Sequence, residues 1–391
     1  MRKRLAAIVL LMLAVWALPV MAQANEKVEY IDFKTNGKSE PYKEYVLESG
    51  KLVRDDKSVT EYTPVNSNTV EWSTGNYVVS SEVTITGRIT VSGFVNLILK
   101  DGAKLKANQG ITAHNGNYLT IYAQSEDDNE MGCIEIPSNL GMNAGIGGIF
   151  DNFSSDKGNC GTVTFNGGRI SFTQGESGSV NERKAAGIGG AYNGSGGKIT
   201  VNGGIIEGIK RYEGACIGGG WNGTGNIFTM NGGVIRNLSS EYGAAIGGGK
   251  RHNNGGYGGT ITINGGTLTS ISSADGACIG GGSGGKGGNI TINGGVITLA
   301  TKSQIADIDG AGIGGGDGGA GGTITINGGT INMIQNQNKR YFGAGIGGGN
   351  GGNGGTIKIT GGNITSKRST GIAAIGSGKN AAAVDVQIAP G

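Results

Sequence analysis

The sequence predicts an all-β chain that folds as a right-handed parallel β-helix solenoid, with three strands per coil and a small N-terminal cap. One phrase, Ala-x-Ile-Gly, occurs eight times at intervals of about 30 residues. A second phrase, close to Ile-Thr-Ile-Asn-Gly-Gly, lies between successive copies, so each repeat contains three short segments with strand character. Stacked units of this kind pair every strand with the coils before and after it and line up their apolar residues inside.

The segment 1–24 predicts a secretory signal peptide. Basic residues at 2–4 precede an apolar stretch over 5–18, and Ala22-Gln23-Ala24 fits a small-x-small cleavage site. We therefore expect an exported protein, secreted or held at the cell surface. A second long apolar run is not found, so we predict no transmembrane segment.

Charge gives little sign of a nucleic-acid partner. Lys and Arg number 32 and Asp and Glu 29, and the three basic residues of the predicted signal peptide account for that excess. A nucleic-acid-binding protein needs a basic surface stripe, so we expect no nucleic-acid partner. The sequence does not indicate an oligomeric state.

Three further regions follow the predicted signal peptide. Residues 25–68 are charged and poor in glycine, and we expect a cap or lead-in module with strands at Val28–Phe33 and Tyr45–Val53. Residues 69–143 alternate between apolar and polar positions without the repeated phrases, which predicts irregular β-helix coils. Residues 144–391 predict the regular, glycine-rich coils.

The residue between Ala and Ile of the first phrase is always small. Ala and Ile share one parity and are expected to point inward, so this residue is expected to face outward. Either glycine-rich turns pack over the resulting bare face, or the face is a flat floor for a ligand. The eight positions are Gly145, Gly187, Cys216, Ala245, Cys278, Gly312, Gly345 and Ala374.

An asparagine precedes the Gly-Gly pair in most repeats. A turn at this point needs left-handed backbone conformations, and an Asn side chain can satisfy turn backbone groups. Stacked coils would place the side chains above one another, which predicts an internal structural ladder. Its members are Asn166, Asn202, Asn231, Asn264, Asn293 and Asn327.

The chain contains four cysteines, too few for a disulfide scaffold of this length. Cys216 and Cys278 occupy one column two coils apart, roughly 10 Å, which exceeds the Cα separation of a disulfide. We expect them to be small buried thiols. Cys133 and Cys160 are about one coil apart, and a bridge between them is left open.

Two segments resemble a known group of proteins. RITVSGFVNLILKDGAKLKANQGI and GAGIGGGDGGAGGTITINGG resemble secreted bacterial β-helix proteins of the pectin-lyase-like type. The resemblance covers roughly residues 69–391. It implies a carbohydrate-binding or adhesin-type surface protein, and some such proteins carry immunoglobulin-A-protease-like labels. The motifs specify the fold far better than the chemistry.

Signatures of catalysis are sparse. Glycosidases need paired carboxylates, whereas the acids of the repeats are scattered, at Glu207, Glu213, Glu241, Asp275, Asp307, Asp309 and Asp317. Hydrolase motifs are missing, and the chain has only two histidines, His114 and His252. We therefore predict no catalytic residue, no metal site and no cofactor, with one loop-bound calcium ion at the Gly-Gly-Asp-Gly-Gly of 315–319 as the open alternative.

Aromatic and basic residues gather at the ends of the predicted strands. Sugars bind by stacking on exposed rings while polar groups fix their orientation. The alternative is a stacked aromatic ladder that covers loops. The carbohydrate-binding candidates are Tyr192, Trp221, Tyr212, Tyr242, His252, Tyr257, Tyr341, Lys210, Arg211 and Lys339.

The favoured function is therefore a non-catalytic, exported β-helix protein that binds polysaccharide or host glycan, as an adhesin does. Two other functions stay open. One is a polysaccharide lyase or glycoside hydrolase of pectin-lyase-like fold, and the other is a purely structural adhesin stalk.

Overall fold

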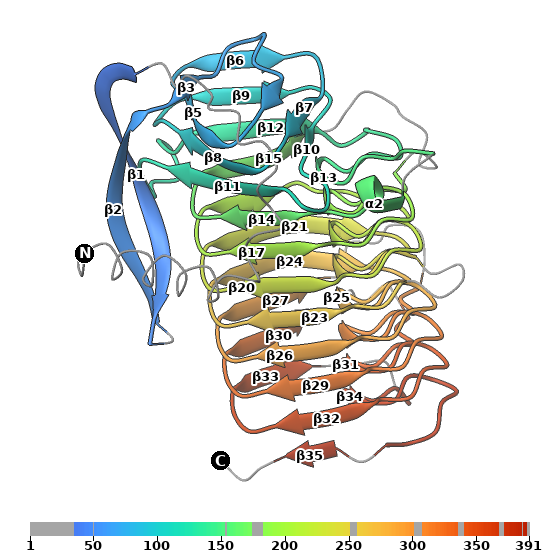
Figure 1. Ribbon diagram of the computed structural model, residues 1–391. Helices are drawn as coiled ribbons and strands as arrows, with labels where there is room; N and C mark the ends of the chain where they lie inside the picture. Colours follow the sequence, from blue (N-terminus) through green and yellow to red (C-terminus); the bar gives the residue numbers. More distant parts are fainter. Residues whose placement is uncertain are drawn as a thin grey trace, which may run out of the picture. The chain divides into compact units, whose positions relative to one another are not determined.

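The computed structural model describes residues 35–49, 51–152, 155–173, 183–250, 256–300, 307–334, 340–366, 371–384 and 386–388. Residues from Thr35 onward form one compact unit. This unit confirms the predicted parallel β-helix, because each coil contributes one strand to each of three parallel sheets (Figure 1). In the described part of the chain these sheets have 12, 10 and 11 strands, which we call sheets 1, 2 and 3.

The strands are short and follow one another through the three sheets in turn. Sheet 1 consists of β3 (Thr63–Pro64), β5 (Gly75–Val79), β8 (Phe94–Leu99), β11 (Tyr118–Ala123), β14 (Thr162–Phe165), β17 (Lys198–Val201), β20 (Ile227–Met230), β23 (Thr260–Ile263), β26 (Asn289–Ile292), β29 (Thr323–Ile326), β32 (Thr356–Ile359) and β35 (Val386–Ile388). Sheet 2 consists of β6 (Glu82–Ile85), β9 (Lys104–Ala107), β12 (Cys133–Pro137), β15 (Arg169–Thr173), β18 (Ile205–Glu207), β21 (Val234–Ser240), β24 (Thr267–Ser273), β27 (Val296–Ala300), β30 (Thr330–Ile334) and β33 (Asn363–Ser366). Sheet 3 consists of β4 (Glu71–Trp72), β7 (Ile89–Val91), β10 (Ile111–Thr112), β13 (Ile146–Gly147), β16 (Ile188–Gly189), β19 (Ile217–Gly218), β22 (Ile246–Gly247), β25 (Ile279–Gly280), β28 (Ile313–Gly314), β31 (Ile346–Gly347) and β34 (Ile375–Gly376).

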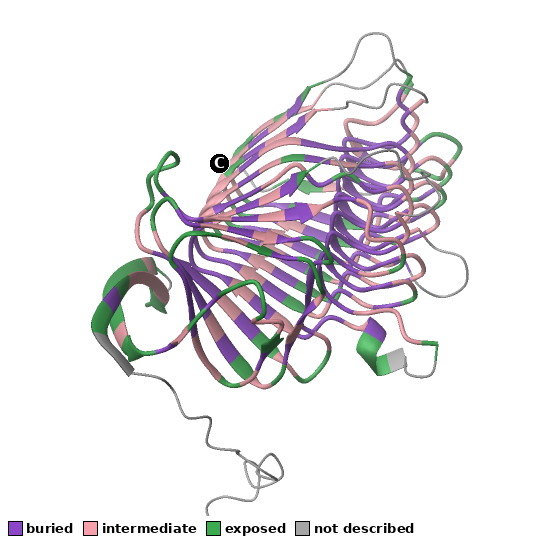
Figure 2. Cartoon of the chain, turned by 90° about the horizontal axis from the view of Figure 1, so that it is seen from above, coloured by how far each residue is buried: buried purple, intermediate pink, exposed green. Residues whose placement is uncertain are grey.

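The core follows from the alternation of the strands. In β23, Ile261 and Ile263 are buried, whereas Thr260 and Thr262 point away from the core. The strands pair in register, so Ile261 lies beside Ile290 of the next coil and the isoleucines form columns. Figure 2, which looks at the solenoid from above, shows this alternation of buried and more exposed positions along the strands.

Glycine in sheet 3 lets neighbouring coils approach closely. Gly218 has a φ of 135°, and a Cβ atom there would collide with the carbonyl oxygen of Gly247 in the next coil. Only glycine tolerates that backbone conformation without strain. The two residues pair in register across β19 and β22, which explains why the Ile-Gly pair recurs in the sheet 3 strands from β13 to β34.

The residue between Ala and Ile lies beneath another part of the chain, so the covered face is confirmed and the flat ligand floor is wrong, although the covering segment is not a glycine-rich turn. Cys216, Ala245 and Cys278 are all buried within the main apolar cluster. A Cβ atom on Gly187 would collide with the side chain of Ile209, which follows sheet 2. The position is restricted to small residues because the segment that follows each sheet 2 strand packs over it. It is therefore not a floor for a ligand.

The N-terminal element is an antiparallel hairpin of β1 (Thr35–Glu48) and β2 (Lys51–Glu61). The sequence predicts one strand over Tyr45–Val53, which is wrong, because the hairpin turn lies inside that range. Glu48 pairs with Lys51, and Ser49 between them has a φ of 50°. The other predicted strand, Val28–Phe33, lies outside the described residues.

The hairpin packs along the flank of sheet 1. Tyr42 and Val59 contact an apolar cluster that includes Ile98 and Tyr122, and the Tyr42 and Tyr122 rings are 4.6 Å apart. Lys100 forms an ion pair of 2.8 Å with Glu40, which is buried. These contacts lie near the carboxyl ends of the sheet 1 strands and leave their amino ends uncovered.

The asparagines form a continuous ladder at the turn between sheets 1 and 2. Each side-chain amide donates to the side-chain oxygen of the preceding coil at 2.7–2.8 Å, from Asn202 to Asn327. Thr360 continues the ladder by donating to Asn327. The ladder is not internal throughout, because its members from Asn264 onward are exposed. The left-handed conformation is taken by the second glycine of each turn, such as Gly233 with a φ of 76°.

All four cysteines are free, which corrects the possible bridge between Cys133 and Cys160. Cys133 lies in β12 of sheet 2 and is half-buried, whereas Cys160 is buried in the core just before β14 of sheet 1. The two cysteines therefore belong to different sides of the coil. Cys216 and Cys278 are buried thiols, as predicted.

One short helix, α2 (Ser155–Gly158), interrupts the loop between β13 and β14. Within the described residues, no helix has the length and hydropathy needed to cross a bilayer.

Candidate functional site

Two of the predicted aromatic residues form a ladder on the loops that lead from sheet 3 to sheet 1. The rings of Tyr192 and Trp221 stack at 4.9 Å with an angle of 7° between their planes. Phe150 meets Tyr192 edge-on at 5.5 Å, and the Lys184 ammonium lies 5.6 Å from the Tyr192 ring centre. Tyr192 and Trp221 therefore each cover one face of the other, and a sugar cannot stack on those two faces.

A second pair lies on the loops that lead from sheet 2 to sheet 3. The rings of Tyr212 and Tyr242 meet edge-on at 4.9 Å, and the Lys250 ammonium lies 4.0 Å from the Tyr242 ring centre. Lys250 also forms an ion pair of 3.2 Å with Glu213. The hydrogen bond with Tyr212 and partial burial raise the pKa of Tyr242 to about 12. Contacts within the protein therefore already engage both tyrosines.

Two other candidates point into the protein. Arg211 is only 6% exposed, donates to the carbonyl of Ser138 at 2.6 Å and lies over the Phe172 ring. Burial lowers the pKa of Arg211 to about 10, so its side chain remains cationic at neutral pH. Tyr341 is 2% exposed and packs against Ile308. Neither side chain is presented to a ligand at the surface.

Of the remaining basic candidates and the histidine, the structure describes Lys210 alone. Lys210 is exposed beside these loops and its backbone pairs with Ser239. His252 and Lys339 lie outside the described residues.

The structure brings together carboxylates that are far apart in the sequence. The backbone N–H of Asp317 donates to the carbonyl of Asp275 at 2.7 Å, so the loops on either side of sheet 3 meet. Burial, together with the nearby charges of Asp309, Asp317 and Glu241, raises the pKa of Asp275 to about 7. The pKa values of Asp309 and Asp317 are also raised, mainly by burial. This cluster was not visible in the linear sequence.

A groove of about 820 Å³ lies along the amino ends of the sheet 1 strands. Residues from five successive coils line it, within the segments 115–118, 159–162, 195–198, 224–227 and 257–260. Its volume lies within the range of ligand-binding pockets. Among the candidates that the structure describes, Tyr257 lines this groove, at its end farthest from Tyr118.

Hydrogen bonds fix part of the groove wall. The Asn159 side-chain oxygen accepts from the backbone N–H of Ser195 at 2.8 Å, which ties two successive coils together. The Thr224 hydroxyl bonds to the side chains of Asn226 at 2.8 Å and Ser195 at 3.2 Å. A wall held in this way is largely formed before a ligand arrives. Binding would therefore lose little side-chain conformational entropy.

An exposed aromatic pair lies at one end of the groove. Phe94 and Tyr118 are the first residues of β8 and β11, and they are 61% and 40% exposed. Their rings stack at 4.3 Å with an angle of 15° between their planes. Tyr118 also lines the groove. Exposed large rings in a polar surface are a frequent feature of binding sites.

The sequence carries a signal for this exposed aromatic pair. Phe94 and Tyr118 directly precede the alternating core residues Val95 and Leu119, so their outward direction follows from strand parity. In the regular coils this first strand position holds smaller or polar residues such as Thr162 and Thr260. Two large rings at this position are therefore a departure from the repeat.

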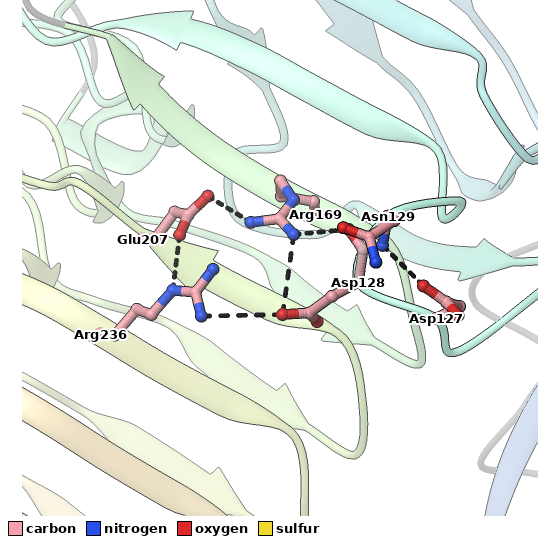
Figure 3. A network of polar contacts seen from close by, with 6 residues as sticks. All are labelled: Asp127, Asp128, Asn129, Arg169, Glu207 and Arg236. Carbon is pink, nitrogen blue, oxygen red and sulfur yellow. Dashed lines mark hydrogen bonds and ion pairs between the residues drawn. The ribbon is translucent and has the colours of Figure 1, made fainter.

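The charged groups of the described solenoid concentrate on other surfaces. On sheet 2, Glu207 pairs with Arg169 and Arg236, both at 2.7 Å, and Asp128 lies 3.7 Å from Arg236 (Figure 3). Burial acts to raise the pKa of Glu207, but the hydrogen bonds from both arginines outweigh it and lower the pKa. Figure 3 also shows Asp127 and Asn129 beside this network. The four paired side chains satisfy one another and serve packing between coils.

Metal ligands are not gathered anywhere in the described ranges: no group of three or more His, Cys, Asp or Glu residues is placed to hold an ion. Asp317, the acid of the Gly-Gly-Asp-Gly-Gly segment, belongs instead to the carboxylate cluster around Asp275.

No protein-family model, no curated protein and no solved structure matches this chain.

Proposed function

We propose that this chain is an exported, non-catalytic β-helix protein that binds polysaccharide or host glycan, as a carbohydrate-binding or adhesin-type surface protein does. One observation carries the proposal: a groove of about 820 Å³ whose amide and hydroxyl side chains lead to the exposed ring of Tyr118. Polar groups that fix hydroxyls, together with a ring that takes an apolar sugar face, are what a glycan site requires. The proposal of export rests on the predicted signal peptide. The pectin-lyase-like character rests on the sequence resemblance.

The groove replaces the Tyr192 and Trp221 pair as the favoured site. Both pairs of rings stack, but Tyr192 and Trp221 are half-buried, whereas Phe94 and Tyr118 are exposed and Tyr118 lines the groove. Arg211 is buried. Tyr257, one of the predicted candidates, lines the groove at its far end.

A glycan array of the purified protein tests this function. We expect binding to at least one polysaccharide class, and loss of that binding in Tyr118→Ala. The control is Tyr212→Ala, because Tyr212 lies on a different loop and does not line the groove. No binding to any glycan would refute the proposal and favour the structural stalk. Glycan binding that Tyr118→Ala leaves unchanged would show that the groove is not the site.

The second candidate function is a polysaccharide hydrolase, and the carboxylate cluster favours it. An aspartic acid with a pKa of about 7, beside two other carboxyls, suits a general acid. A reducing-sugar assay on the glycans that bind separates the two functions. Turnover that disappears in Asp275→Asn would favour the hydrolase, whereas binding without product supports the binding protein.

A further inference from the structure

The residues that line the groove carry almost no charge. Among its described lining residues, Lys198 is the one charged side chain, and the polar remainder are amides and hydroxyls. Ion-paired carboxylates and arginines are found on other surfaces, such as sheet 2. A strongly anionic polymer would meet one cationic partner among the described lining residues, whereas uncharged hydroxyls would meet donors and acceptors along the whole length.

The polar groups of the groove recur once per coil. Asn115, Thr162, Ser195, Thr224 and Thr260 each come from a different coil. Adjacent strands lie about 4.8 Å apart, so five coils span about 19 Å along the solenoid axis. That step is comparable to one sugar unit of an extended chain, and the total length exceeds a mono- or disaccharide. The groove is therefore built for a chain of several units.

The aromatic pair gives the groove two different ends. Tyr118 stands at one end and its ring is supported from behind by Phe94, at 4.3 Å. Stacking on a ring that is already held in place loses little side-chain conformational entropy. At the other end Tyr257 lines the groove beside Gly259 and Thr260. A bound chain would therefore be oriented along the coils between these two ends.

Building on the proposed glycan-binding function, we propose that the groove binds a neutral, linear polysaccharide whose chain runs parallel to the solenoid axis. Each coil contacts about one sugar through its hydroxyl or amide side chain, and a sugar at one end stacks on Tyr118.

Calorimetric titration of the full chain with defined oligosaccharides tests the ligand class. The probes are cello-, xylo- and manno-oligosaccharides of two to six units, with oligogalacturonates of the same lengths as anionic counterparts. For one neutral series we expect affinity to rise with length and to level off at about four to five units, because about four coil spacings are available. We expect the hexagalacturonate to bind at least tenfold more weakly than the best neutral hexamer.

Matched substitutions test the position of the chain. Thr260→Val removes a groove hydroxyl, and Thr323→Val removes the same group at the same strand position outside the groove. We expect Thr260→Val to weaken hexamer binding severalfold and Thr323→Val to leave it unchanged. Tyr118→Ala should weaken binding at least tenfold, and Tyr118→Phe should retain most of it. Because both threonines are exposed, neither substitution is expected to unfold the protein.

The outcomes separate this inference from the proposed function. Tighter binding of the galacturonates, affinity that stops rising at two units, or equal effects of the two threonine substitutions would each overturn the inference while leaving glycan binding intact. If no oligosaccharide of the panel binds, the inference fails. If the glycan array is also negative, the proposed function fails with it.

Discussion

Replacement of Gly218 by alanine should test how tightly the coils are stacked at sheet 3. A Cβ atom at this position would collide with the carbonyl oxygen of Gly247, and the φ of 135° is outside the range that alanine adopts easily. The backbone strain costs about 1–3 kcal/mol, and the overlap with a neighbouring backbone costs about 1–3 kcal/mol more. Two inter-coil hydrogen bonds flank the collision: Ile217 N–H to Ala245 at 3.0 Å and Gly219 N–H to Gly247 at 2.9 Å. We therefore expect a loss of about 3 kcal/mol or more.

The matched control is Gly351→Ala. Gly351 also has a positive φ, of 75°, but a Cβ atom there would meet no other atom within 4 Å. Replacement of Gly351 by alanine should lower the free energy of unfolding by about 1–2 kcal/mol, the cost of a left-handed backbone conformation for alanine. Urea unfolding followed by far-UV circular dichroism gives the free energies, and hydrogen exchange of the Gly219 amide reports the local opening. Equal losses for the two variants would refute close stacking as the reason for glycine at position 218.

Three further predictions concern side chains. Asn231→Ala removes one donated and one accepted ladder hydrogen bond, and we expect urea unfolding to show a loss of about 1–2 kcal/mol; no loss would mean that the ladder is not stabilising. Glu207→Gln leaves Arg169 and Arg236 without their closest carboxylate, so unfolding at low salt should show a loss of about 1–2 kcal/mol that shrinks at high salt; a salt-independent loss would contradict the electrostatic account. Because the folded pKa of Asp275 is raised to about 7, its contribution favours folding at low pH and is lost as the pH rises from about 4 to 7. Relative to Asp275→Asn, the original chain should therefore lose stability across that interval, and parallel stability–pH curves for the two proteins would show that the shift is absent.

The sequence predicted the coil architecture because the solenoid is dictated by local pattern. Strand parity places Ile261 and Ile263 inside, and repetition at a fixed interval makes each strand pair with its counterpart one coil later. The asparagine column follows from the same register. Such features need no knowledge of distant contacts, since every coil repeats the environment of its neighbours.

The errors arose where side chains depend on contacts that parity does not describe. The residue between Ala and Ile was expected to face outward. The segment that follows each sheet 2 strand covers it instead, as Ile209 covers Gly187. Arg211 looks like a surface cation in sequence, yet its side chain extends to the carbonyl of Ser138 two coils away. The cluster around Asp275 depends on loops from both sides of sheet 3 meeting, which sequence spacing alone does not reveal.

The groove arises where the repeat is broken. In the regular coils the first position of the sheet 1 strand holds no aromatic residue. The groove is bounded at one end by Phe94 and Tyr118, two large rings at this position, and Tyr257 lines its other end. Between them the short loops 190–197 and 219–226 keep the polar side chains of the wall accessible. A stalk that acted only as a spacer would not need two exposed rings, because uniform coils stack equally well. Selection for binding would therefore act on the residues that line the groove, and the repeated coils hold these residues in register.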